Sequence, residues 1–178
     1  MIRKILAYGV IAGLIVGVPL FGVTVTAKDH LDMPGMALTY LVMLIALSTV
    51  FVAIKRRRDM DLGGVIRFWP AVGFGLGISL VAGIVYVVAW ESAIAISHFD
   101  FAAGYAKAMI AEQQAKGVSA EALAKFTAQM EEFKVQYANP LFRLPMIFIE
   151  IFPVGVLVSL VSAGLLRNSR FFPARRAG

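Results

Sequence analysis

The chain is organised as long apolar runs separated by short charged stretches. Four runs carry at most one charged residue each, and they cover residues 5–26, 36–54, 68–96 and 144–166. A helix rises about 1.5 Å per residue, so about 20 apolar residues cross a hydrocarbon core of about 30 Å. The pattern predicts an all-α membrane protein with four transmembrane helices, forming a single membrane domain over residues 1–178.

The first run shares some features with a cleaved signal peptide. Arg3 and Lys4 precede it, and the sequence Val25-Thr26-Ala27 resembles a cleavage site of small residues. Its apolar stretch is longer than the roughly 7–15 residues of a signal peptide, however, and glycines recur along it as in a packed helix. We therefore expect the first helix to be retained.

The segment between the third and fourth runs, residues 98–140, is more polar but keeps a helical spacing of apolar side chains. Two series recur every three or four residues: Phe101, Tyr105 and Met109, then Leu123, Phe126, Met130, Phe133 and Tyr137. Gly117 and Asn139-Pro140 are typical of helix ends, and Ser119 is typical of a helix start. We expect an extracytoplasmic helical hairpin whose apolar seams bury each other or rest on the bilayer. The alternative is a docking face for a periplasmic partner or a second copy.

The basic residues indicate how the chain is oriented. The net charge is +6, from 17 basic and 11 acidic residues, and the basic residues cluster at the ends of apolar runs. Eleven lie on one side of the predicted spans: Arg3, Lys4, Lys55, Arg56, Arg57, Arg58, Arg67, Arg167, Arg170, Arg175 and Arg176. Six lie on the other side, in longer loops that also carry acids. The positive-inside rule then predicts a multi-pass protein of the bacterial inner membrane with both termini cytoplasmic. The expected partner is the lipid bilayer and not nucleic acid.

Small residues recur at every fourth position in three of the four runs. They are Gly9, Gly13 and Gly17 in the first, Ala71, Gly75, Ser79 and Gly83 in the third, and Gly155, Ser159 and Ala163 in the fourth. Residues i and i+4 share a helix face, so each strip lets another backbone approach closely. We expect these strips to pack the helices of one chain together, with formation of a homo-oligomer as the alternative.

Two carboxylates interrupt the apolar runs and are the candidate functional residues. Glu91 lies in the third run and Glu150 in the fourth, and the helical rise places both in the outer part of the bilayer. His98 and Arg143 each lie seven residues further outward, which is close to two helical turns. The sequence predicts a polar cluster of these four residues. Its role is a structural ion-pair cluster, a proton- or cation-handling site, or a site for a small ligand or lipid headgroup.

No catalytic motif competes with this cluster. The chain has no cysteine, and it lacks the His-Glu-x-x-His, serine-elbow and phosphate-loop motifs. The glycines of residues 73–77 lie inside an apolar run without the preceding strand that a nucleotide-binding loop requires. We expect no enzymatic activity, no cofactor and no metal site.

Several motifs resemble the DUF4199 family of bacterial membrane proteins. They are Arg57 with Gly63-Gly64 and Phe68, Ala82-Gly83-Ile84-Val85-Tyr86 with Trp90, Tyr137-x-Asn139-Pro140, and Glu150-Ile151-Phe152-Pro153-Val154-Gly155. The resemblance covers essentially the whole chain and implies four spans with a long third loop, without an established activity. We expect a structural, interaction or accessory membrane protein. The alternative is a small oligomeric transporter or proton-linked permease that uses Glu91 and Glu150.

Overall fold

The computed structural model describes residues 1–26, 34–98 and 100–173, without the side chains of residues 26 and 34–40. Over these residues the chain is all-helical and contains no strand. The helices are α1 (Ile2–Thr26), α2 (Pro34–Asp61), α3 (Phe68–Ser97), α4 (Phe101–Ala115), α5 (Ala120–Ala138) and α6 (Pro140–Leu166). Lys28, Arg175 and Arg176, three of the basic residues counted from the sequence, lie outside the described residues.

Three of these helices are long and apolar enough to cross a membrane. The stretches are Ile2–Val25, Phe68–Ser97 and Pro140–Leu166, which agree with the first, third and fourth apolar runs. Over its described side chains α2 is less apolar, because Lys55, Arg56, Arg57 and Arg58 occupy its last turns. The structure therefore supports an all-helical protein of membrane type, with α2 packed against the three apolar helices.

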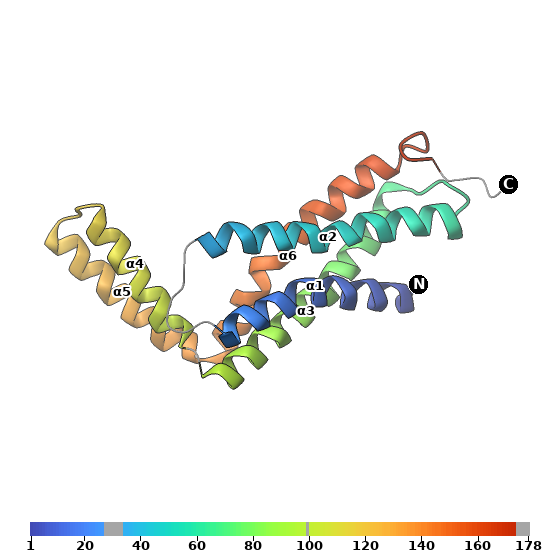
Figure 1. Ribbon diagram of the computed structural model, residues 1–178. Coiled ribbons are helices and arrows are strands. Elements are labelled where there is room, and N and C mark those ends of the chain that lie inside the picture. Colours follow the sequence, from blue (N-terminus) through green and yellow to red (C-terminus); the bar gives the residue numbers. More distant parts are fainter. Residues whose placement is uncertain (27–33, 99, 174–178) are drawn as a thin grey trace.

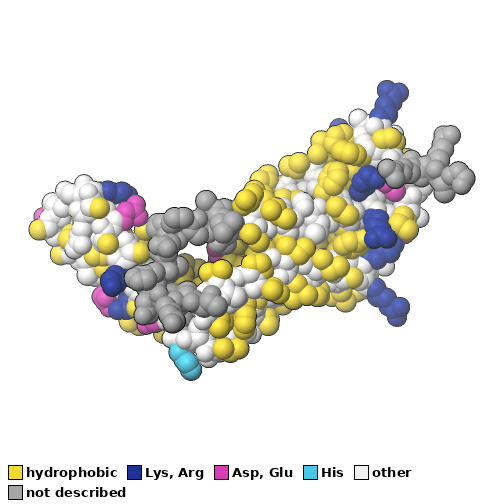
Figure 2. All heavy atoms as spheres, in the orientation of Figure 1, with side chains coloured by type: hydrophobic (Ala, Val, Ile, Leu, Met, Phe, Trp, Pro, Cys, Tyr) yellow, Lys and Arg dark blue, Asp and Glu magenta, His cyan; other side chains and the backbone are white. Residues whose placement is uncertain are grey.

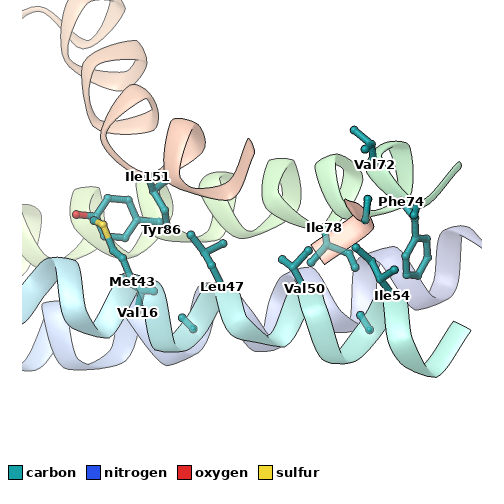
Figure 3. Close-up of a cluster of buried hydrophobic side chains, with 14 of the residues drawn as sticks. Val16, Met43, Leu47, Val50, Ile54, Val72, Phe74, Ile78, Tyr86 and Ile151 are labelled. Carbon is teal, nitrogen blue, oxygen red and sulfur yellow. The ribbon is translucent and has the colours of Figure 1, made fainter. Parts of the chain in front are cut away.

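The four long helices form a bundle (Figure 1). α1 packs along α3, α3 packs against α6, and α2 contacts all three of them. Apolar side chains of α2 and α3 form the centre of the core, where Met43, Leu47, Ile78 and Tyr86 are buried (Figure 3). α1 begins and α6 ends at the same end of the bundle, and α4 and α5 lie at the other end (Figure 1).

The glycine strip of α1 lies directly against α3. A Cβ atom added at Gly9 or Gly13 would lie 2.5 Å from the Cβ atom of Val81 or Val85, closer than such atoms can approach. A Cβ atom at Gly17 would lie 2.9 Å from that of Ala89. The absence of side chains on this face of α1 is therefore what allows the two helices to touch.

The small residues of α3 and α6 face each other in the same way. The contacting pairs are Gly75 with Ser159, Gly155 with Ser79, and Gly83 with the ring of Phe148. All three strips predicted from the sequence thus lie in helix contacts within one chain.

α4 and α5 run side by side and turn away from the bundle (Figure 1). Asp100 and Ser119 cap them, since each side chain accepts a hydrogen bond from the backbone N–H three residues further on. Between the helices Gly117 has a φ of +68°, a left-handed conformation that glycine adopts without strain. Aromatic rings meet across the pair, and the ring centroids of Tyr105 and Phe133 are 5.6 Å apart.

The surface of the bundle is apolar along its length and basic at one end (Figure 2). Exposed leucine, isoleucine and valine side chains cover the outer faces of α1, α2, α3 and α6. Lysine and arginine side chains gather where α1 begins and α6 ends (Figure 2). This distribution is typical of a helical protein in a bilayer.

Candidate functional site

An ion pair joins α3 to α6 at the end of the bundle that carries α4 and α5. Arg143 donates from Nε to Oε1 of Glu91 at 2.7 Å and from Nη2 to Oε2 of Glu91 at 2.6 Å. Two parallel hydrogen bonds of this kind give the strongest arginine–carboxylate geometry. Nη1 of Arg143 also donates to the backbone carbonyl of Tyr137 at 3.2 Å. One guanidinium therefore connects α3, α5 and α6.

Aromatic side chains pack beside this ion pair, and the Arg143 guanidinium lies 5.7 Å from the centroid of the Tyr137 ring. Nε1 of Trp90 donates to the Tyr137 hydroxyl at 2.9 Å, and Phe101 of α4 lies edge-on to Trp90 with ring centroids 5.0 Å apart. Burial raises the pKa of the Tyr137 hydroxyl to about 12, and the carboxylates of Glu91 and Glu150 add to the rise. Tyr137 therefore remains neutral at physiological pH. We call Trp90, Glu91, Tyr137 and Arg143 the outer cluster.

Glu150 lies beside the outer cluster and not inside it. Its Oε2 atom accepts a hydrogen bond at 3.2 Å from the hydroxyl of Tyr86, a buried residue of α3, and Glu150 as a whole is exposed. Within the described residues no hydrogen bond or ion pair joins it to Glu91 or Arg143. The two carboxylates predicted to share one site thus have different partners, and both contribute to the field at Tyr137.

His98 is separate from the cluster, contrary to the sequence prediction. It follows the last residue of α3 in a left-handed conformation with a φ of 53°, and its side chain is exposed. Its seven-residue spacing from Glu91 predicts a shared face only if the helix continues, and α3 ends at Ser97. In the part of the chain that the structure describes, no hydrogen bond or ion pair links His98 to either carboxylate.

A groove of about 440 Å³ opens next to the outer cluster, between the end of α3, the start of α4, the end of α5 and the start of α6. Tyr137 and Arg143 line it, together with Asp100, which precedes α4, and Glu131 and Lys134 of α5. This volume lies within the range of small-ligand sites. A second groove of about 390 Å³ continues between α4 and α5. Over the described residues, no three His, Cys, Asp or Glu side chains lie close enough together to hold a metal ion.

A second buried polar site, which the sequence did not predict, lies at the opposite end of the bundle. Arg58 of α2 is 0% exposed. Its guanidinium donates to Asp59 at 2.7 Å and to the backbone carbonyls of Leu166 at 3.4 Å, Phe171 at 2.9 Å and Phe172. We call this the Arg58 site. In the sequence Arg58 is one of several consecutive basic residues, which predicts a solvated side chain, and its acceptors come from a distant segment.

Comparison with known proteins agrees with the resemblance carried by the motifs. Residues 7–168 match the family described as protein of unknown function (DUF4199), which confirms that resemblance over most of the chain. Neither a curated protein nor a solved structure matches the chain.

Proposed function

We propose that this chain, which belongs to the DUF4199 family of unknown function, is a structural or interaction protein of the bacterial inner membrane. In this proposal α1, α2, α3 and α6 cross the membrane and both termini are cytoplasmic. α4 and α5 lie on the extracytoplasmic side, where the exposed face of α5 contacts a second protein or a second copy of the chain. The observation that carries the proposal is the ion pair between Glu91 and Arg143.

This ion pair is suited to fixing helices in place. Glu91 and Arg143 neutralise each other through two short hydrogen bonds, and a third bond extends the constraint to α5. The two charge-assisted hydrogen bonds hold the Glu91 carboxylate and the Arg143 guanidinium in one fixed geometry. Removing either partner would leave the other charge partly buried without its counter-charge. The ion pair therefore favours a fixed scaffold.

The charge at one end of the bundle and the contacts between its helices support the proposed topology. The end where α1 begins and α6 ends is basic, as the positive-inside rule requires of a cytoplasmic face (Figure 2). α1 contacts α3 through Gly9, Gly13 and Gly17, which favours its retention as a span. α2 contacts α1, α3 and α6 over the same length of the bundle, which favours its being the fourth span. We propose no catalytic role, because the sequence contains no catalytic motif.

A double-mutant cycle on Glu91 and Arg143 tests the structural role of the ion pair. Glu91→Gln leaves the guanidinium without its counter-charge and is expected to cost about 3 kcal/mol, the lower end of the range for buried pairs, since Glu91 is partly exposed. Adding Arg143→Met should recover part of this loss. Thermal unfolding in detergent measures both effects. Single variants as stable as the wild type, with coupling near zero, would contradict the proposal.

A photo-crosslinking experiment tests the interaction role. Ala128 is exposed on α5, and Ile84 is exposed on the face of α3 that we assign to lipid. A crosslinking amino acid at Ala128 should give a discrete protein adduct in native membranes, and one at Ile84 should not. The Ala128 adduct should weaken when Glu91→Gln is added, because α5 is then less firmly held. Equal adducts at both positions, or none at Ala128, would count against an interaction surface on α5.

The alternative is a small oligomeric transporter or proton-linked permease that uses Glu91 and Glu150. The observation that favours it is Glu150, which is exposed within a spanning-length helix and accepts a hydrogen bond from Tyr86. Under this alternative Glu150→Gln abolishes a pH-dependent flux in reconstituted vesicles while the protein unfolds at an unchanged temperature. Under the structural proposal no such flux exists in the wild type.

A further inference from the structure

The groove next to the outer cluster lies where α3 and α6 leave the spanning part of the bundle. Its apolar lining includes Ile94 of α3, Phe101 of α4 and Val135 of α5. Val135 is 75% exposed, although valine is an apolar residue on an otherwise polar helix face. Exposed apolar side chains also lie on α6, among them Leu141 at its start, which is 83% exposed, and Ile149, which is 64% exposed. Apolar surface is therefore present both in the groove and on the helix that begins beside it.

The same groove carries charged groups of both signs with unused hydrogen-bonding capacity. Lys134 is 34% exposed and its ammonium contacts only Glu131 among the described residues, at 2.9 Å, although it has three N–H donors. Arg143 uses three of its five N–H groups on Glu91 and the Tyr137 carbonyl. Asp100 accepts one hydrogen bond through Oδ1, from the backbone at the start of α4. Donors for a phosphate and acceptors for an ammonium thus line one groove.

We propose that this groove binds the headgroup of a zwitterionic phospholipid that carries a primary ammonium, as in phosphatidylethanolamine. Lys134 and Arg143 donate to the phosphate, and Asp100 and Glu131 accept from the ammonium. The acyl chains then lie along Leu141 and the outer face of α6. The inference rests on the part of the proposed function that takes α3 and α6 across the membrane, and it requires no protein partner.

A lipid fits the groove better than a purely anionic ligand. Its two cations are already paired, Lys134 with Glu131 and Arg143 with Glu91, and Asp100 is the charged lining residue without an ion pair among the described residues. A purely anionic ligand would therefore face carboxylates that no added cation balances. A primary ammonium can donate to carboxylates, whereas the quaternary ammonium of a phosphatidylcholine has no N–H group. The groove should therefore distinguish these two lipids through the ammonium and not through the phosphate.

Native mass spectrometry of the full-length protein, titrated with defined lipids in mild detergent, tests the proposal. The wild type should bind phosphatidylethanolamine about tenfold more tightly than phosphatidylcholine or phosphatidylglycerol. Lys134→Met should weaken the binding of all three, because it removes a phosphate donor. Asp100→Asn keeps the capping oxygen of α4 and removes only the charge, so it should lower the affinity for phosphatidylethanolamine alone.

A matched control comes from the ion pair of Lys116 and Glu112, whose N···O distance is 2.6 Å and which lies outside both grooves. Lys116→Met combined with Glu112→Gln should leave lipid selectivity unchanged. Equal affinities for phosphatidylethanolamine and phosphatidylcholine would overturn the proposal, as would retained selectivity in the Lys134→Met, Asp100→Asn double variant. Tighter binding of phosphatidylglycerol would indicate an anion site instead.

The molecule that occupies the groove in native membranes can be identified by photo-crosslinking at Val135. A photo-crosslinking amino acid at this position should form lipid adducts, which are identified by mass. Protein adducts without lipid adducts would show that a protein fills the groove, and the proposal would be wrong. Ala128 lies on the same face of α5, two helical turns from Val135, so the mass of the adduct separates the two tests. A protein adduct at Ala128 reports the interaction surface and a lipid adduct at Val135 reports the groove, and either can fail without the other.

Discussion

Arg58 shows how much one side chain contributes when its acceptors are all internal. Its guanidinium is fully buried, and the carbonyls that it contacts belong to the last residue of α6 and to the chain just after it. Arg58→Met would leave those carbonyls without their donor and the Asp59 carboxylate with Lys55 alone. We expect a loss of about 3–5 kcal/mol in the free energy of unfolding. Arg56→Met is the control, since Arg56 is exposed, and should change stability by no more than about 0.5 kcal/mol. Equal effects of the two variants in chemical unfolding would contradict this account.

Asp59 gives the Arg58 site a dependence on pH. Burial by itself would raise the pKa of Asp59, but hydrogen bonds from Arg58 and Lys55 outweigh it and hold the pKa below the ordinary value. A carboxyl group with a lowered folded-state pKa stabilises the protein above its unfolded pKa, about 4, and this contribution is lost as the pH falls through the folded-state value.

The stability difference between wild type and Asp59→Asn should therefore be constant between about pH 5 and pH 8, and should shrink below about pH 4. Thermal unfolding across this pH range in detergent measures it. A difference that instead grows as the pH falls would show that the carboxylate is not stabilised by its neighbours.

At the scale of the helices, the contact between α1 and α3 depends on the missing Cβ atoms of Gly9 and Gly13. Gly13→Ala should cost about 1–3 kcal/mol, because the new methyl group meets the Cβ atom of Val85 and the helix backbones have to separate. Gly73→Ala on α3 is the control, since an added Cβ atom there meets nothing within 4 Å. Alanine at that position should be neutral or stabilising. The difference in melting temperature between the two variants gives the measurement, and no difference would place α1 away from α3.

The sequence predicted the helices well and their lateral contacts only in part. Helix ends follow from local signals such as the caps Asp100 and Ser119. Strips of small residues indicate where two helix backbones approach each other. The lipid-facing side was harder to assign, because both sides of a span are apolar. Val87 continues the four-residue spacing of the α3 strip after Gly83 and packs against the core, whereas its neighbour Val88 is exposed.

The contacts within the candidate sites could also be predicted only in part. The spacing along α3 and α6 brought Glu91 and Arg143 to comparable depth, and the structure places them in contact. Spacing could not show that the chain leaves the helix at His98, or that Tyr86 contacts Glu150. The bond between Trp90 and Tyr137 joins residues that are 47 positions apart, so no local pattern predicts it.

At the scale of the whole molecule, the basic end of the bundle and the α4–α5 pair should lie on opposite sides of the membrane. The chain contains no cysteine, so single cysteines can be introduced as reporters without a background. Met60→Cys at the basic end and Lys116→Cys near the α4–α5 turn both replace exposed residues. A membrane-impermeant maleimide should label Lys116→Cys in intact cells and Met60→Cys only after permeabilisation. The reverse result would invert the topology.

The Arg58 site also has a consequence for how the protein is made. Arg58 and the carbonyls of Leu166 and Phe172 are separated by 108 and 114 positions in the chain. At the ordinary speed of translation, Arg58 leaves the ribosome on the order of 10 s before its acceptors exist. Until then the guanidinium has only its neighbour Asp59 and water as partners, and a charged side chain of this kind favours keeping the end of its helix out of the bilayer. The same side chain is withdrawn from water once residues 166–172 have been made, so this end of the bundle can close only after those residues emerge.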